Sequence, residues 1–173
     1  MMLNKELSML LETQYGELFK IRSCYKNVFE IMTDYIPVLS HKDVRVLFCY
    51  AYNGSYYYRH AFCVCKGELI EPLGKVRENL MVEKTIPICE LDFNDYIKLI
   101  LREERYDLFS SLFAHNIRAI NKNKKQMKQL NPIEANDIVS YLTKTADDAL
   151  IIFRSLIAGN GIPDKYIAVH DKL

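Results

Sequence analysis

The 173-residue sequence lacks several features that would define a functional class at once. No apolar run approaches the roughly 18 residues that cross a bilayer, and the first residues do not resemble a signal peptide. The formal net charge is only +1, so no overall field attracts nucleic acid or an acidic membrane. We therefore expect a cytoplasmic protein with no membrane partner, and we do not expect nucleic acid as its main partner.

The sequence also lacks the cysteine pattern of a disulfide framework or a zinc site. Its five cysteines are an odd number and are unevenly spread, which favours reduced thiols. Cys63 and Cys65 share one face of an expected strand, with Cys49 on a neighbouring strand, yet the paired spacings of a zinc site are absent. We favour hydrophobic packing for these thiols, and we predict no metal and no cofactor.

The composition is that of a globular protein, with 50% hydrophobic and 26% charged residues. Tryptophan is absent, whereas 12 tyrosines and 8 phenylalanines are present. A chain of this length buries enough surface to fold without disulfides. We therefore expect residues 1–173 to form a single domain.

The first half of the chain changes from helical to strand periodicity. Apolar residues recur at helical spacing over residues 3–14, and a second helix, capped by Ser23, opens at Cys24 and ends before Pro37. β-Branched and aromatic residues then predict strands separated by turns at Asn53-Gly54 and Lys66-Gly67. These expected strands cover residues 44–52, 56–65 and 68–71.

The second half is mainly helical. An irregular strand broken by Pro87 is expected over residues 80–88, and the last helix is expected to be capped by Thr145. The expected helices cover residues 92–104, 106–129, 131–141 and 145–159. This order predicts an α+β fold in which the helical part, residues 91–159, packs on a core formed by residues 16–90.

A possible reactive group lies at the start of the second helix. A thiol is a useful nucleophile when it is ionised, and a helix N-terminus favours the ionised form. The backbone amides of Cys24 and Tyr25 would also point to one position, where they could hold an oxyanion. A base must come from elsewhere in the fold, and His60, within an expected strand, is the candidate.

A third group is needed to orient the imidazole, and strand parity points to Glu71. If Lys66-Gly67 is a two-residue hairpin loop, Phe62 faces Glu71 across the two strands. Side chains alternate between faces, so His60 shares a face with Phe62 and therefore with Glu71. His60 and Glu71 then become diagonal neighbours, within reach of a long side chain.

These residues resemble a motif set of small papain-like proteins, many of them from bacteria and phages. The set consists of Cys-aromatic-x-Asn on a helix, His-Ala-aromatic, a glycine turn, and an acid before proline. Its counterparts here are Cys24-Tyr25-Lys26-Asn27, His60-Ala61-Phe62, Gly67 and Leu69-Ile70-Glu71-Pro72. The resemblance covers residues 20–73 and implies a papain-like core with N-terminal helices and an antiparallel β-meander.

The resemblance implies that Cys24 is the nucleophile, His60 the general base and Glu71 the orienting acid. The glutamine that papain places shortly before its cysteine, as an oxyanion donor, is absent, and Gln14 is a possible substitute further upstream. Asn27 is a candidate for the site or for a structural hydrogen bond in the first helical turn. The remaining candidates for oxyanion or substrate binding are Tyr25, Tyr58 and Phe62.

Two functions remain open at this level. The first is a cysteine hydrolase or acyl-transfer enzyme that cleaves an amide, peptide or ester bond through a thioester. The second is a non-catalytic binding module on a papain-like scaffold, of phage or mobile-element origin, which grips a host protein through its tyrosines or C-terminal helices. A weaker third hypothesis is nucleic-acid binding through the basic run at residues 122–128.

Overall fold

The computed structural model of the chain describes residues 1–34, 44–104, 132–161 and 163. It shows a mixed α+β fold built on one five-stranded sheet with the order β1-β4-β3-β2-β5. The antiparallel pairs are β2 with β3, β3 with β4 and β2 with β5, whereas β1 pairs with β4 in parallel. The strands are β1 (Met2–Leu3), β2 (Val44–Tyr52), β3 (Tyr57–Cys65), β4 (Glu68–Ile70) and β5 (Ile86–Asp92).

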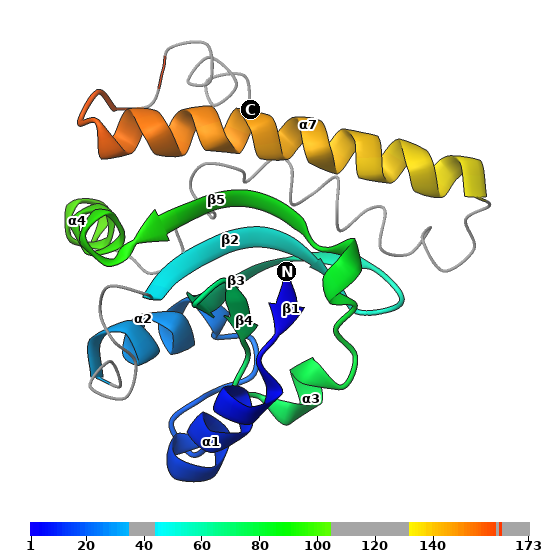
Figure 1. Ribbon diagram of the computed structural model, residues 1–173. Helices are drawn as coiled ribbons and strands as arrows, with labels where there is room; N and C mark the ends of the chain where they lie inside the picture. Colours follow the sequence, from blue (N-terminus) through cyan, green and yellow to red (C-terminus); the bar gives the residue numbers. More distant parts are fainter. Residues whose placement is uncertain (35–43, 105–131, 162, 164–173) are drawn as a thin grey trace.

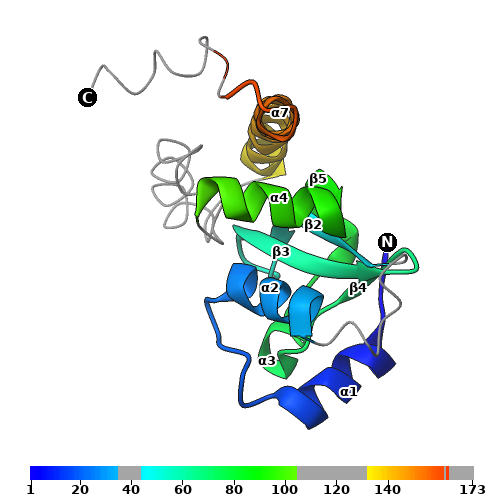
Figure 2. The same cartoon turned by 90° about the vertical axis from the view of Figure 1, so that its left-hand side faces the viewer.

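Helices surround this curved sheet. Figure 1 shows α7 lying along β5, whereas α1 lies at the opposite end of the molecule, below β4 and β1. Figure 2 shows α2 and α4 in front of the strands. The described helices are α1 (Lys5–Tyr15), α2 (Cys24–Asp34), α3 (Gly74–Arg77), the 3-10 turn η3 (Val82–Lys84), α4 (Phe93–Glu103) and α7 (Pro132–Ile157).

Both faces of β2 and β3 are buried. Alternate side chains of β2 belong to two separate apolar clusters, with Val46 and Phe48 in the larger cluster and Leu47 and Cys49 in the smaller one. This alternation is the period-two pattern of a strand. The larger cluster also includes side chains of α2, α4 and α7, so these helices are anchored to the same face of the sheet.

Phe48 joins three helices to the sheet. Its side chain is fully buried, and its ring centroid lies 5.2 Å from Phe153 of α7, 6.2 Å from Tyr25 of α2 and 6.3 Å from Tyr96 of α4. Aromatic rings at such distances contribute more than the burial of their area alone. Phe48 therefore helps to position α2, the helix that begins with Cys24.

Two of the expected elements were wrong. The strand expected at residues 80–88 is replaced by η3 and by β5, which begins at Ile86 and contains Pro87. Pro87 does not break this strand because β5 is at the edge of the sheet, and Pro87 faces Cys49 where the register with β2 shifts.

The second error concerns the two helices expected at residues 131–141 and 145–159, which the structure joins into one. Residues 132–157 form the single helix α7, and Thr145 is not a cap, because its hydroxyl donates 2.9 Å to the carbonyl of Tyr141 inside the helix. Threonine makes this bond within helices as readily as it caps them. The helix expected at residues 106–129 and the basic run at 122–128 lie outside the described residues.

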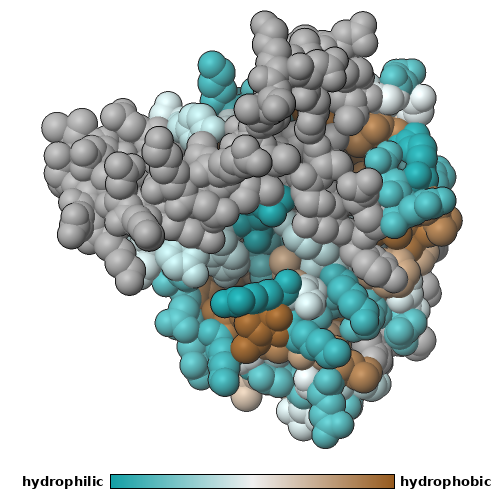
Figure 3. Space-filling model, turned by 180° about the vertical axis from the view of Figure 1, so that it is seen from behind, coloured by the Kyte–Doolittle hydropathy of each residue, from teal (hydrophilic) through white to brown (hydrophobic). Residues whose placement is uncertain are grey.

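Seen from behind, hydrophilic side chains cover most of the coloured face, with small hydrophobic groups between them (Figure 3). Among the described helices, none combines the length and the apolar content needed to cross a membrane.

We expect Phe48→Ala to lower the free energy of unfolding by about 3–5 kcal/mol, because it leaves a cavity among three helices. Phe48→Leu should cost about 1 kcal/mol, since most of the volume is retained. Urea unfolding followed by circular dichroism measures both values. Leu101→Ala is the control, because Leu101 is 72% exposed. A Phe48→Ala protein as stable as this control would contradict the packing described here.

Candidate active site

Cys24 is the first residue of α2, and the loop before it is held by Asn27. The Asn27 side chain is buried, accepts from the Lys20 amide at 3.1 Å and donates to the Lys20 carbonyl at 3.0 Å. The Asn27 amide donates in turn to the Ser23 carbonyl at 2.8 Å. Asn27 thus fixes the conformation of the loop that precedes Cys24, and its role in the site is structural.

His60 lies in β3, beyond the end of its pairing with β4. That pairing covers only residues 63–65 of β3, so β4 does not cover the strand at His60. The imidazole is 4% exposed and packs between the rings of Tyr58, at 5.4 Å, and Phe62, at 4.4 Å, both edge-on. These aromatic neighbours restrict the rotation of the ring.

The predicted contact between His60 and Glu71 is present. Cys65 pairs with Glu68, as a two-residue hairpin loop requires, and the His60 Nε2 atom lies 2.8 Å from Glu71 Oε2. The other carboxylate oxygen, Oε1, accepts from the Leu73 amide at 3.0 Å. Both oxygens of this buried carboxylate therefore have hydrogen-bond partners, as buried charge requires.

Three residues that sequence reasoning missed hold Glu71 in place. The buried Ser8 hydroxyl accepts from the Glu71 amide at 3.1 Å, and Arg77 donates to the carbonyls of Glu71 and Pro72 at 2.7 and 2.8 Å. Arg77 also pairs with Glu12, which accepts from the Gly74 amide at 2.9 Å. The hydrogen bond from Arg77 lowers the pKa of Glu12.

Cys24 and Glu71 both act on the His60 ring. Burial disfavours the charged ring, but hydrogen bonds with the Cys24 and Glu71 side chains, and the charges of these groups, raise the pKa of His60 to about 10. A protonated imidazole beside a sulfur stabilises negative charge on it, and that charged form is the nucleophile.

The three residues line one pocket of about 960 Å³, a size that suits a peptide segment or small molecule. Of the other candidate residues, Tyr25, Asn27 and Tyr58 also line it. Phe62 does not, because it is fully buried behind the imidazole. Gln14 is not brought to the pocket, since it lies on the exposed side of α1.

The other four cysteines are buried and serve packing. Cys63 lies 3.6 Å from the Met32 sulfur in the larger apolar cluster, whereas Cys49 belongs to the smaller cluster on the opposite face. Burial raises the pKa of Cys49 and Cys63, and raises that of Cys89 to about 11. In the part of the chain that the structure describes, no group of three or more His, Cys, Asp or Glu residues could hold a metal ion.

Comparisons with known proteins found no family model that matches the chain and no similar curated protein or solved structure. What the structure itself shows is a thiol, an imidazole and a carboxylate that line one pocket, with the imidazole hydrogen-bonded to the carboxylate.

We expect the stability of the protein to fall between about pH 6.5 and pH 10 through His60. Below the unfolded pKa of about 6.5, the ring is protonated in both states and its stabilising contribution is complete. Above it, the unfolded chain loses the proton whereas the folded chain keeps it until about pH 10. The free energy of unfolding should therefore decrease by at most about 1.4 kcal/mol per pH unit.

Urea unfolding from pH 6 to pH 10 measures this slope. Glu71→Gln should flatten it, because the neutral amide no longer stabilises the imidazolium. Glu90→Gln should leave the slope unchanged, since Glu90 forms only an exposed pair with Arg45. Equal slopes in the protein and its Glu71→Gln variant would contradict a His60 pKa that is raised by Glu71.

Proposed function

We propose that the protein is a cysteine hydrolase or acyl-transfer enzyme on a papain-like scaffold. The observation that supports this most directly is the buried His60 ring, which is hydrogen-bonded to Glu71 and lines the same pocket as Cys24. The order of Cys24, His60 and Glu71, on a helix followed by an antiparallel meander, is also that of papain-like enzymes. The proposed substrate contains an amide, peptide or ester bond.

In the first step, the Cys24 sulfur attacks the carbonyl carbon and forms a carbon–sulfur bond. His60 holds the proton removed from the thiol, and Glu71 stabilises the resulting imidazolium. When the tetrahedral intermediate collapses, the carbon–nitrogen or carbon–oxygen bond breaks and His60 gives its proton to the leaving group. The product is a thioester on Cys24.

The oxyanion of this intermediate needs hydrogen-bond donors. The amides of Cys24 and Tyr25 are in the first turn of α2, where helix geometry provides no intrahelical acceptor. Tyr58 lines the same pocket and packs against the His60 ring, so it is the side-chain donor that we propose in place of the missing glutamine. Burial raises the pKa of Tyr58, so its hydroxyl keeps its proton at neutral pH.

In the second step, His60 removes a proton from water, or from the hydroxyl or amine of an acceptor. The activated oxygen or nitrogen attacks the thioester carbon, the carbon–sulfur bond breaks, and the thiol is regenerated. Water as acceptor makes the protein a hydrolase, and another nucleophile makes it a transferase.

Iodoacetamide should alkylate Cys24 of the native protein selectively at pH 6.5, and faster than it alkylates a simple thiol such as N-acetylcysteinamide. The other four cysteines are buried, so they should react only after unfolding. His60→Gln should reduce the rate at Cys24 by at least about tenfold, because a positioned base contributes roughly 10²–10⁴-fold. Mass spectrometry of tryptic peptides measures each rate.

A Cys24 that reacts no faster than N-acetylcysteinamide, and equally in the His60→Gln variant, would sink the proposed chemistry. The chain would then be better described as a binding module that uses the same pocket and its tyrosines to hold a partner protein. Unfolding of both proteins, followed by circular dichroism, checks that His60→Gln is folded.

p-Nitrophenyl acetate separates acylation from simple alkylation. Attack by Cys24 releases one equivalent of p-nitrophenolate and passes through an oxyanion, whereas alkylation by iodoacetamide does not. Tyr58→Phe should therefore slow the nitrophenolate burst by at least about tenfold and leave the iodoacetamide rate unchanged. Tyr56→Phe is the matched control, because Tyr56 is a second tyrosine that lines the same pocket. An unchanged burst in Tyr58→Phe would remove Tyr58 from the oxyanion site.

A further inference from the structure

The pocket around Cys24 is strongly basic, although the chain as a whole is nearly neutral. Basic residues number 23 and acidic residues 22 in the whole sequence. By contrast, Glu71 is the only acidic residue among the described residues that line the pocket, and it is hydrogen-bonded to His60. The basic residues that line it are Lys20, Arg22, Lys26, Arg59 and Lys75.

Three of these cations are available to a ligand. Lys20, Arg22 and Lys75 are exposed, and within the described residues none of them forms a salt bridge. Lys26 differs, since it pairs with Glu30 at 3.4 Å. Because the three free cations come from the loop before α2 and from α3, they approach the pocket from two sides.

Arg22 is held in a costly backbone conformation two residues before Cys24. Its φ angle is 68°, in the left-handed region that residues other than glycine rarely adopt. Glycine would adopt this conformation without strain. Lys66 and Glu104 also have positive φ angles, but among these three residues only Arg22 lines the pocket.

We infer that the pocket takes an acyl substrate that carries a carboxylate, such as an acidic peptide. This inference rests on the proposed function and adds the substrate class to it. The carboxylate lies among Lys20, Arg22 and Lys75 while the scissile carbonyl faces the Cys24 sulfur. Exposed cations attract such a group from solution, and they do so less strongly as salt is added.

Two alkylating reagents of nearly equal size test the charge preference. Iodoacetate and iodoacetamide both react by displacement, in which the Cys24 sulfur forms a carbon–sulfur bond and iodide leaves. Only iodoacetate carries a carboxylate. The measured quantity is the ratio of the iodoacetate rate to the iodoacetamide rate at Cys24, divided by the same ratio for N-acetylcysteinamide. We expect this quotient to be at least about fivefold at low salt.

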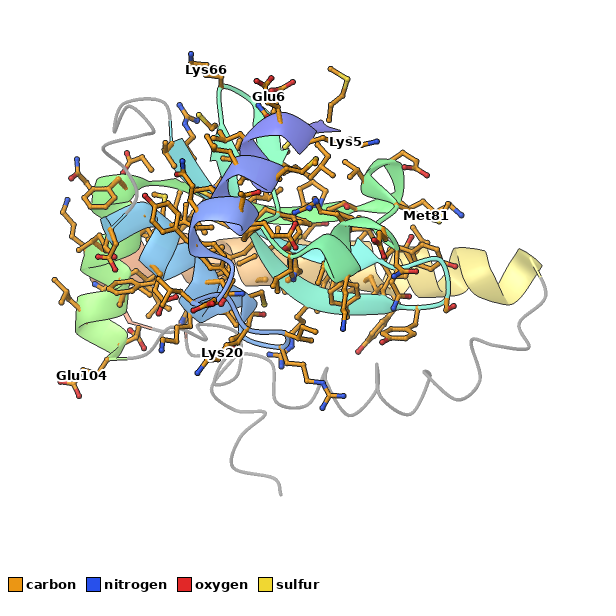
Figure 4. The ribbon with its side chains drawn as sticks, turned by 90° about the horizontal axis from the view of Figure 1, so that it is seen from below. Lys5, Glu6, Lys20, Lys66, Met81 and Glu104 are labelled. Carbon is orange, nitrogen blue, oxygen red and sulfur yellow. The ribbon has the colours of Figure 1, made fainter. Side chains whose placement is uncertain are left out.

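Charge-removing variants assign the preference to particular side chains. Lys20→Gln, Arg22→Gly and Lys75→Gln should each lower the quotient about twofold, the effect of one charge about 10 Å away in water. Their folding is protected, because Lys20 bonds Asn27 only through its backbone and glycine relieves the strain at position 22. Lys66→Gln is the matched control, since Lys66 lies on the opposite side of the molecule from Lys20 (Figure 4) and does not line the pocket.

Peptides distinguish a side-chain carboxylate from a C-terminal carboxylate as the group that the pocket binds. A hexaglutamate with blocked ends and a hexaalanine with a free C-terminus are compared as protectants of Cys24 against iodoacetamide, at equal ionic strength. Protection by hexaglutamate assigns side-chain carboxylates, and protection by hexaalanine assigns a terminal carboxylate. Protection by neither peptide would overturn the inference, as would protection by an oligonucleotide alone.

The two possible failures are distinguishable. If Cys24 reacts rapidly with iodoacetamide but the quotient is near one, or is unchanged in all three variants, the carboxylate inference fails and the proposed chemistry remains. If Cys24 is no more reactive than N-acetylcysteinamide toward either reagent, the proposed chemistry fails first. A quotient that stays high in Lys66→Gln and falls in the other variants supports the inference.

Discussion

The His60 imidazole is almost wholly withdrawn from solvent, and a protonated ring in such a place is costly unless acceptors surround it. The Cys24 and Glu71 side chains together offset this cost and raise the pKa of His60. The Glu71 hydrogen bond is 2.8 Å long, and burial alone would favour the neutral ring. The protonation state of His60 therefore depends in part on the position of the Glu71 carboxylate.

The position of the Glu71 carboxylate is fixed mainly by hydrogen bonds to the backbone of Glu71 and Pro72. Ser8 fixes the Glu71 amide from α1, and Arg77 fixes the carbonyls of Glu71 and Pro72 from α3. Because Glu12 of α1 also pairs with Arg77, the two helices are linked to each other as well as to the turn. The N-terminal helix is thus part of the site although none of its residues lines the pocket.

Local features of the site could be predicted from sequence, whereas its supports could not. The start of α2 at Cys24 and the His60–Glu71 contact follow from helix and hairpin rules that act over a few residues. Ser8 contacts Glu71, which is far from it in the sequence, and Arg77 contacts the backbone carbonyls of Glu71 and Pro72. The periodicity of a sequence does not reveal contacts of either kind. Gln14 illustrates the same limit, because its distance in sequence did not reveal that it points away from the site.

The basic residues of the pocket act against protonation of His60, because a nearby positive charge lowers the pKa of an imidazole. The relative distances decide the outcome. Glu71 acts at 2.8 Å in a buried environment, whereas Lys20, Arg22 and Lys75 are exposed and their fields are screened over about 8 Å at physiological salt. The exposed cations therefore act mainly on a ligand that enters the pocket. An oxyanion formed during attack by Cys24 would be stabilised both by the imidazolium and by the exposed cations, because all of these groups carry positive charge.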